Sequence, residues 1–227
     1  LQGPMANGEP VEWDVLDAAV KSKMNGLGGG KKLVFLTQTY ASPSTNRLMT
    51  ELTASNENVN HVTYDAISED AALTAFENVY GERALADYDF EKSQLIVSFG
   101  ADFLSDWQGG GFDSGYSRGR VPKNGKMSRH IQVEANMSLT GANADKRIPL
   151  TPTAQKIVLA KLYGKLSGVS VGGNTSEYDT IVDQLAKEVK QAGSNAVVVT
   201  GLDDVNAQMV VLAINKMLGS TAFDAAA

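Results

Sequence analysis

The chain is built from short segments with two different hydrophobic periods. Short apolar or alternating runs predict strands at residues 33–36, 61–64, 95–97, 130–134 and 196–199. The runs at 33–36 and 196–199 are apolar throughout, which is typical of strands buried on both faces of a sheet. The run at 130–134 alternates apolar and polar residues, as a strand with two unlike faces does.

Between these strands, apolar residues three or four positions apart predict helices. Ser42-Pro43 and Thr151-Pro152 each place a capping hydroxyl before a proline at the first helical position. Ser176 and Asp179 have the spacing of a capping box at the start of another helix. The remaining helices are expected at residues 11–23, 68–80 and 205–218, and the last two end at Gly81 and Gly219.

The first three predicted strands and the helices between them give the order βαβαβ. Because such crossovers are right-handed and cover both faces, this order predicts a doubly wound, mostly parallel sheet with helices on both faces, a Rossmann-like α/β fold. Residues 101–129 break the pattern with glycines and predict a long binding or docking loop. We therefore expect one α/β domain over residues 11–227, divisible into halves at 11–104 and 148–219.

Residues 1–10 are expected to lie outside this domain. Leu1-Gln2 before Gly3-Pro4 looks like the remnant of a cleavable tag or a flexible leader, and the first residues lack the basic and apolar regions of a signal peptide. No run approaches the ~18 apolar residues that a membrane-spanning helix needs. The sequence therefore predicts no direct membrane span.

The composition excludes several kinds of chemistry. The chain of 227 residues is 43% hydrophobic and 20% charged, which is ordinary for a globular domain with a sizeable core. It has no cysteine, so this segment holds no thiolate zinc site, cysteine nucleophile or cysteine-bound iron–sulfur cluster. With only His61 and His130, multi-histidine metal sites are not expected, and both histidines are interpreted as structural. The net charge of -6 argues against a protein that coats nucleic acid.

Two glycine-rich stretches do not fit phosphate-binding motifs. At residues 26–32, Lys32 stands where a phosphate loop needs Ser or Thr, and the stretch precedes a strand instead of following one. At residues 109–114, Ser114 stands where a dinucleotide fingerprint has its third glycine. A stand-alone nucleotide-binding module remains as a third hypothesis, behind the two described below.

The long loop carries a local cationic patch in an acidic chain. Its positive residues recur about every third position and are Arg118, Arg120, Lys123, Lys126 and Arg129. Such a patch fits an acidic protein surface, an anionic cofactor or a solvated loop. Nucleic acid is not expected, because the aromatic residues needed for base stacking are confined to Tyr116. We predict that the loop docks against another protein segment.

Two acidic pairs, Asp102 with Asp106 and Asp203 with Asp204, are candidates for general acid–base chemistry. Asp203 and Asp204 fall in the first turn of a predicted helix, where negative charge offsets the helix dipole. Asp102 follows directly after a predicted central strand, where ligands sit in open α/β sheets. Asp102 is therefore the stronger functional candidate.

The order of segments resembles the dinucleotide-cofactor region of the molybdopterin oxidoreductases. Three motifs carry this resemblance. The stretch EWDVLD at residues 12–17 is similar to the family's opening WDEAL helix, and LIVSFGAD at 95–102 is similar to its strand ending in G-x-N. The stretch ADKRIPLTP at 144–152 is similar to the signature ADxxLPIRPGTD.

A narrower resemblance lies in the central block. The segments GADFLSDW at 100–107, GKM at 125–127 and MSLTGANAD at 137–145 resemble the iron–sulfur subunit of bacterial alternative complex III. That subunit fuses a molybdopterin oxidoreductase-like half to a ferredoxin-like half. The likeness extends over residues 11–218, and the block at 100–152 is its most specific part.

The resemblance implies that Gly100, Asp102, Asp145 and Gln155 lie where the family binds the molybdopterin guanine dinucleotide. Residues 151–155 (TPTAQ) align with the family's RPGTD but lack its arginine, glycine and aspartate. Neutral Gln155 offers no charge-assisted bond to guanine, and Asp102 replaces the family's asparagine with a negative charge that repels a pyrophosphate. We therefore expect a vestigial pocket, with no cofactor, metal or catalytic residue in this segment.

Two functional hypotheses follow. In the first, the chain is a cofactor-free scaffold domain of a membrane-associated, quinol-oxidising electron-transfer complex on the periplasmic side of a bacterial membrane. Its iron–sulfur clusters would lie in the missing part of the parent chain, and its partners would be other segments of that chain and other subunits. In the alternative, the chain is a fragment of an active molybdenum oxidoreductase and contributes part of the molybdopterin guanine dinucleotide site.

Overall fold

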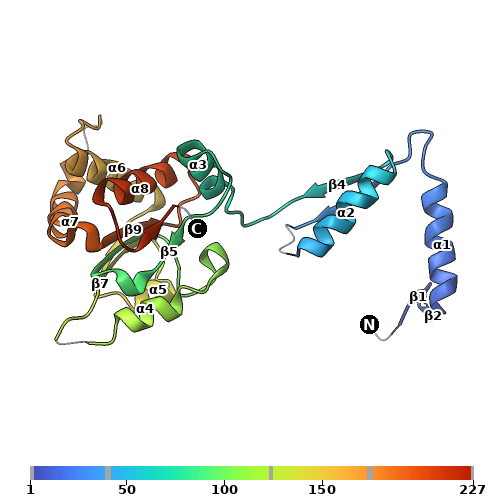
Figure 1. The fold of residues 1–227 in the computed structure, drawn as a ribbon, viewed down its shortest axis with the longest axis horizontal. Helices are drawn as coiled ribbons and strands as arrows, with labels where there is room; N and C mark the ends of the chain where they lie inside the picture. Colours follow the sequence, from blue (N-terminus) through green and yellow to red (C-terminus); the bar gives the residue numbers. More distant parts are fainter. Residues whose placement is uncertain (1–2, 39–41, 123–124, 173–175, 226–227) are drawn as a thin grey trace. The chain divides into compact units, whose positions relative to one another are not determined.

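A computed structural model describes residues 3–38, 42–122, 125–172 and 176–225. The structure divides the chain into two units, Leu1–Ile67 and Ser68–Ala227 (Figure 1). The boundary between them falls inside the first of the two expected halves, residues 11–104. Each unit is described by itself.

In the first unit, the described residues form two small sheets and two helices. Strands β1 and β2 form an antiparallel pair, and β3 and β4 form a parallel pair that is joined by α2. The expected helix at residues 11–23 forms as α1, although none of its described residues is buried. The elements are β1 (Met5–Ala6), β2 (Glu9–Pro10), α1 (Trp13–Asn25), β3 (Leu33–Thr37), α2 (Pro43–Ser55) and β4 (Val59–Thr63).

The expectation that residues 33–36 form a strand buried on both faces is wrong. In β3, half-buried residues alternate with exposed ones, and the side chains of Val34 and Leu36 are 53% and 68% exposed. A pair of strands offers little surface for a second covering layer, and α2 packs against β4. The apolar run therefore forms the predicted strand with only one sheltered face.

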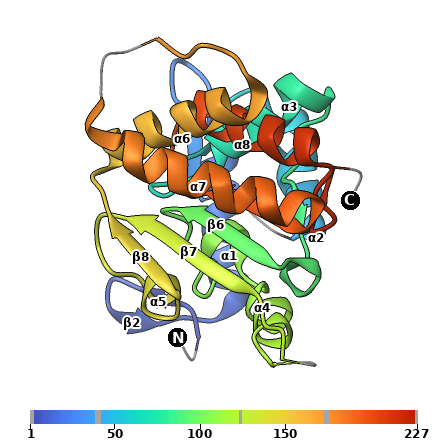
Figure 2. The same ribbon diagram turned by 90° about the vertical axis from the view of Figure 1, so that its left-hand side faces the viewer.

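The second unit is built around a four-stranded parallel sheet in the order β8-β7-β6-β9. Helices lie on both sides of this sheet (Figure 2), so the expected doubly wound α/β fold class is confirmed. The elements named in the following paragraphs are α3 (Asp70–Tyr80), β6 (Leu95–Phe99), α4 (Asp113–Gly119), β7 (Arg129–Glu134), α5 (Leu139–Ala142), β8 (Lys146–Pro149), α6 (Pro152–Ser167), α7 (Asp179–Ala192), β9 (Ala196–Thr200) and α8 (Val205–Leu218). The second unit also contains a short antiparallel pair, β5 (Asp87–Tyr88) with β10 (Phe223–Asp224).

Successive side chains along each central strand point alternately into two separate hydrophobic cores. Val97 and Phe99 of β6 belong to a core with α6 and α7, whereas Ile96 points to the opposite face. That second core contains Phe76 of α3 and a group of packed aromatic rings around Phe103. Both faces of the sheet are therefore buried, as expected for a parallel sheet.

The expectation that residues 33–97 build one βαβαβ sheet is wrong. Strands β3 and β4 pair with each other, while β6 pairs with β7 on one side and β9 on the other. A strand has only two hydrogen-bonding edges. Because both edges of β6 are already used, neither β3 nor β4 pairs with it.

Two of the three predicted helix-capping motifs are confirmed. The hydroxyls of Ser42 and Thr151 each accept a hydrogen bond, at 3.3 Å, from the backbone N–H three residues later. The capping box at 176–179 is wrong, because residues Ser176–Tyr178 form a 3-10 turn and α7 begins at Asp179 without a side-chain cap. The segment 101–129 is also more ordered than a loop, since it contains α4 and the 3-10 turn Trp107–Gly109.

The outer edge of β9 is closed by side-chain amides of α8. Asn215 accepts a hydrogen bond from the N–H of Val198 (2.9 Å) and donates one to the Val198 carbonyl (2.7 Å), as a neighbouring strand would. Gln208 donates to the carbonyls of Thr200 and Leu202 at 3.2 and 3.1 Å. Buried backbone groups at a sheet edge need such partners, so α8 takes the place of a fifth strand.

Replacing Asn215 with leucine tests whether its side-chain amide stabilises the outer edge of β9. We expect Asn215→Leu to lower the free energy of unfolding by roughly 3 kcal/mol, since it leaves a buried N–H and a buried carbonyl of Val198 without partners. The measurement is urea unfolding followed by circular dichroism. Asn206→Leu, on the exposed side of the same helix, is the matched control and should change stability by less than about 0.5 kcal/mol. Equal effects of the two substitutions would contradict the role given to Asn215.

Candidate functional site

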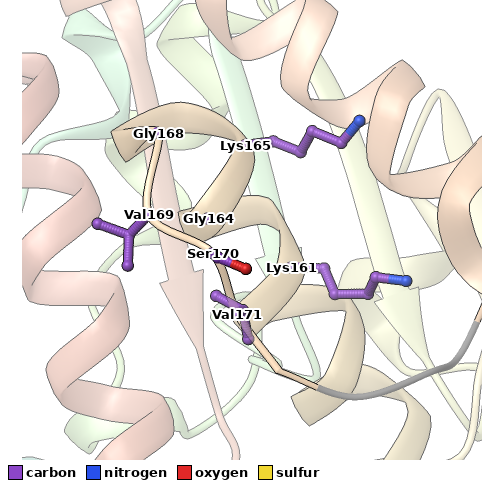
Figure 3. A pocket seen from close by; sticks show the side chains of 7 residues that line it. All are labelled: Lys161, Gly164, Lys165, Gly168, Val169, Ser170 and Val171. Carbon is purple, nitrogen blue, oxygen red and sulfur yellow. The ribbon is translucent and has the colours of Figure 1, made fainter.

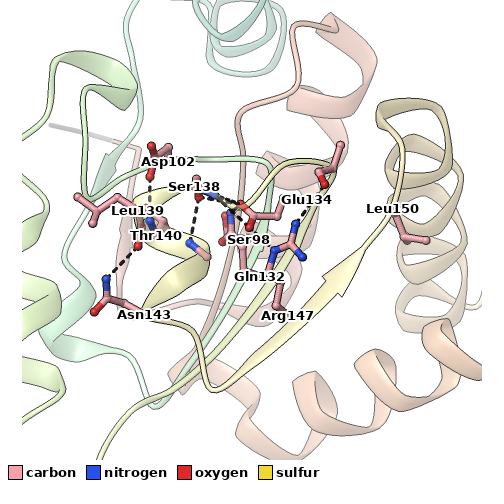
Figure 4. A network of polar contacts seen from close by, with 12 residues as sticks. Ser98, Asp102, Gln132, Glu134, Ser138, Leu139, Thr140, Asn143, Arg147 and Leu150 are labelled. Atoms are coloured by element: carbon pink, nitrogen blue, oxygen red, sulfur yellow. Dashed lines mark hydrogen bonds and ion pairs between the residues drawn. The ribbon is translucent and has the colours of Figure 1, made fainter.

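The candidate site lies at the carboxyl ends of the parallel strands, where open α/β sheets bind their ligands. Gly100 and Asp102 follow β6, the turn at Ser138 follows β7, and Gln155 lies in the first turn of α6 after β8. Figure 4 shows the polar side chains that gather there. The site is therefore built from three consecutive strand ends.

Asp102 is engaged by the short helix that follows β7. Its Oδ1 accepts a hydrogen bond from the backbone N–H of Thr140 at 2.9 Å (Figure 4). The Thr140 hydroxyl in turn accepts one from the N–H of Leu104, also at 2.9 Å. These two hydrogen bonds connect the segment after β6 to α5. The Asp102 carboxylate therefore has a structural role.

Glu134, the last residue of β7, is the second carboxylate at this edge and is only 3% exposed. It accepts hydrogen bonds from the Ser138 hydroxyl (2.7 Å), Arg147 Nε (2.6 Å) and Gln132 Nε2 (3.2 Å). Burial alone raises the pKa of this carboxyl, but the hydrogen bonds from its three partners outweigh burial and lower the pKa below its usual value. Glu134 is therefore a buried anion held by its own domain.

Gly141 is required by the position of Glu134. A Cβ atom at Gly141 would lie 1.9 Å from Oε1 of Glu134, so no larger residue fits without displacing the carboxylate. The first turn of α5 thus lies directly against Glu134. The same turn supplies the Ser138 hydroxyl that Glu134 accepts from.

Gly100 and Gln155 are neighbours in the structure. Gly100 adopts a φ of 71°, which favours glycine, and a Cβ there would lie 3.1 Å from Oε1 of Gln155. Gln155 is 2% exposed, and its Nε2 donates to the carbonyl of Leu150 at 2.9 Å. Within the described part of the chain, Oε1 of Gln155 has no hydrogen-bond partner.

Asp145 lies at the opposite end of the strands from the candidate site. It precedes β8, so it stands at the amino ends of the strands, where it accepts two hydrogen bonds from Arg120 (2.7 and 2.8 Å) and one from the N–H of His130 (2.7 Å). The hydrogen bonds from Arg120 lower the pKa of the Asp145 carboxyl. The structure therefore brings together Gly100, Asp102 and Gln155, but not Asp145.

The predicted cationic patch is largely neutralised within the domain. Arg118 pairs with Glu91 at 2.5 Å, Arg120 pairs with Asp145, and Arg129 pairs with Glu188 at 2.7 Å. Lys123 lies outside the described residues. Lys126 forms no ion pair among the described residues, and it lines a cavity of about 470 Å³ together with the exposed side chains of Val121 and Met127.

A polar strip on β7 was not predicted as part of a site. His130, Gln132 and Glu134 share one face of the strand, and all three are buried. Their alternation with Ile131 and Val133 is visible in the sequence as a period of two. The pattern indicates two unlike faces, but it does not indicate that the polar face is covered.

A second cavity lies against the C-terminal half of α6 and is shown in Figure 3. Its volume is about 390 Å³, and the segment from Gly168 to Val171 forms one wall. A Cβ at Gly164 would lie 2.8 Å from the carbonyl of Val169, so this wall packs directly on the helix. The two lysines that line the cavity, Lys161 and Lys165, both form ion pairs with aspartates of α7.

The described residues hold no group of three or more His, Cys, Asp or Glu side chains that could bind a metal ion. Among the helices that the structure describes, none is long and apolar enough to cross a membrane.

Comparisons with known proteins show the fold and no family. No protein-family model and no curated protein matches the chain. Among solved structures, the chain is similar to a chain of the formyltransferase/hydrolase complex FhcABCD from Methylorubrum extorquens, solved in complex with methylofuran. The identity is 14% and the TM-score 0.60, with 96% of this chain and 56% of that chain covered. This chain therefore spans little more than half of that protein, and the likeness supports the α/β fold alone.

Removing the cation beside Glu134 should destabilise the protein. We expect Arg147→Met to lower the free energy of unfolding by roughly 2 to 3 kcal/mol, since a buried carboxylate loses a charged partner. Arg129→Met is the matched control, because the side chain of its partner Glu188 is 18% exposed, whereas the side chain of Glu134 is 4% exposed. The control should cost less than about 1 kcal/mol. Urea unfolding of both variants measures the difference, and a control as costly as Arg147→Met would contradict the role of burial.

His130 should make stability depend on pH. Burial lowers its pKa from 6.5 to about 4, so the unfolded chain binds this proton more readily than the folded chain between these values. The stability contributed by the neutral ring is complete above pH 6.5 and is lost as pH falls toward 4, by roughly 3 kcal/mol in total. The wild type should therefore lose more stability than His130→Gln between about pH 7 and about pH 5 in urea unfolding. Identical pH profiles for the two proteins would contradict the lowered pKa.

Proposed function

We propose that this chain is a cofactor-free scaffold domain of a membrane-associated, quinol-oxidising electron-transfer complex on the periplasmic side of a bacterial membrane. The sequence resemblance to the iron–sulfur subunit of alternative complex III motivates the proposal. In it, the redox centres lie in other parts of the parent chain and in partner subunits. This segment contributes a rigid α/β body and its surfaces.

The observation that best supports a cofactor-free domain is that Asp102 and Glu134 already occupy the hydrogen-bond donors at this site. Doubly wound domains hold phosphates with N–H donors at the helix starts that follow their strands. Here the N–H of Thr140 is taken by Asp102, while the N–H and hydroxyl of Ser138 are taken by Glu134. A nucleotide phosphate would have to displace two carboxylates and would be repelled by both.

Exposed apolar residues of the first unit support a role in a larger assembly. Val34 and Leu36 of β3, together with Val62 of β4 and the following Tyr64, are 46–69% exposed. Parallel strands are normally covered on both faces, and exposed apolar patches commonly mark contact surfaces. Other segments of the parent subunit and other subunits are the proposed partners. The cavity beside Lys126, where the ammonium group lacks an ion-pair partner among the described residues, is the proposed contact surface of the long loop at residues 101–129.

One observation favours the alternative, an active molybdenum enzyme fragment. The buried Oε1 of Gln155 lacks a partner within the described residues, next to the glycine at position 100. A buried acceptor of this kind fits an N–H donor of a bound base. The neutral amide offers one such contact, whereas the two carboxylates at the same edge oppose the phosphates.

Elemental analysis of the natural full-length complex distinguishes the two. We expect iron without stoichiometric molybdenum, and no heat when the chain alone is titrated with guanosine diphosphate at millimolar concentration. The double variant Asp102→Asn with Glu134→Gln removes the two charges and is the matched comparison. Stoichiometric molybdenum in the complex, or nucleotide binding by the unaltered chain, would overturn the proposal in favour of the enzyme. Binding gained only by the double variant would identify the two carboxylates as the obstacle.

A further inference from the structure

A buried chain of polar contacts runs along one face of β7. The Tyr116 hydroxyl lies 3.2 Å from Nδ1 of His130, and Nε2 of His130 lies 3.2 Å from Oε1 of Gln132. Nε2 of Gln132 then donates to the carbonyl of Ala101 and to Oε2 of Glu134, both at 3.2 Å. Neither Tyr116 nor His130 takes part in the proposed function.

The amide of Gln132 has one allowed orientation. The carbonyl of Ala101 accepts hydrogen bonds and cannot donate. Glu134 is ionised, because it accepts from Arg147 and Ser138, so it is also an acceptor only. Nε2 of Gln132 must therefore face these two oxygens, and Oε1 must face His130. It follows that Nε2 of His130 carries a hydrogen in every protonation state.

The other ring nitrogen of His130, Nδ1, faces the Tyr116 hydroxyl, which lies near two hydrogen-bond acceptors. In the neutral ring, Nδ1 has no hydrogen and needs a donor, which is the Tyr116 hydroxyl. The same hydroxyl lies 3.0 Å from the carbonyl of Asn143, which is a second acceptor. One hydroxyl hydrogen cannot serve both acceptors. A proton on Nδ1 removes the conflict, since Nδ1–H donates to the Tyr116 oxygen and the hydroxyl hydrogen turns to Asn143.

We infer that Nδ1 of His130 is a buried proton-binding site, and that the Tyr116 hydroxyl moves its hydrogen bond from His130 to the Asn143 carbonyl when the proton binds. In the protonated form, helix α4 is tied through Tyr116 to both β7 and the turn before β8. In the neutral form, the Asn143 carbonyl loses the hydrogen bond from Tyr116. The fold thus contains a proton-operated switch between these two sets of contacts.

The groups around the ring set the pH range of the switch. Arg120, at the end of α4, opposes the positive charge, whereas Asp145 before β8 and Glu134 on β7 favour it. The Tyr116 hydroxyl and the Gln132 oxygen are its hydrogen-bonding neighbours, and the Phe103 ring packs 5.3 Å from the imidazole. Burial dominates and lowers the pKa of His130 to about 4, so the switch acts in acid.

Nitrogen-15 NMR of the whole labelled chain tests the inference. The two histidines are assigned with a His61→Gln variant, and long-range proton–nitrogen spectra identify the tautomer of each ring. We expect His130 to carry its hydrogen on Nε2 at neutral pH and to gain a second one on Nδ1 in acid while the methyl signals stay dispersed. A hydrogen on Nδ1 at neutral pH, or unfolding while the ring is still neutral, would overturn the inference.

A tyrosine variant tests the role of the hydroxyl. Tyr116→Phe removes the acceptor for Nδ1–H, so His130 should bind its proton about tenfold more weakly. Tyr80→Phe removes a hydroxyl at the edge of the same aromatic core and should leave the titration of His130 unchanged. Wild-type proton affinity in Tyr116→Phe would overturn the switch. If that variant does not fold, the tautomer of the wild-type ring decides.

Discussion

The pairing of β6 on both of its edges is the constraint on which the second unit depends. Every residue of this strand is buried, so its two ladders with β7 and β9 cannot be replaced by water. The side chains alternate between two cores, which fixes the register of the neighbouring strands. The outer edge of β9 is then closed by Asn215 and Gln208. The carboxyl ends of the strands, where the candidate site lies, are positioned as a consequence.

The polar groups at those ends are used to hold the fold together. Asp102 connects the segment after β6 to α5, and Glu134 connects the end of β7 to α5 and to β8 through Ser138 and Arg147. Each carboxylate occupies donors that an anionic ligand would otherwise find. The same contacts that stabilise this end of the sheet therefore oppose a phosphate, and this opposition is the reason for proposing a scaffold.

The fold alone does not choose between these functions, because doubly wound sheets support many unrelated activities. The likeness to a chain of a formyltransferase/hydrolase complex supports the architecture at 14% identity. Particular side chains bear on function more directly. The carboxylates of Asp102 and Glu134 repel a phosphate, whereas Oε1 of Gln155, which has no partner within the described residues, is an acceptor open to a ligand.

Local signals in the sequence determined the strands at 95–97 and 196–199, the helix starts at Ser42 and Thr151, and the helix end at Gly219. These features depend on neighbouring residues, so hydrophobic period and capping chemistry are enough to predict them. Only the tertiary structure decided which strands pair, that Asp145 lies at the amino edge, and that the polar face of β7 is buried. Each of these depends on contacts between residues far apart in the chain, and a period of two indicates that a strand has two faces without indicating what covers them.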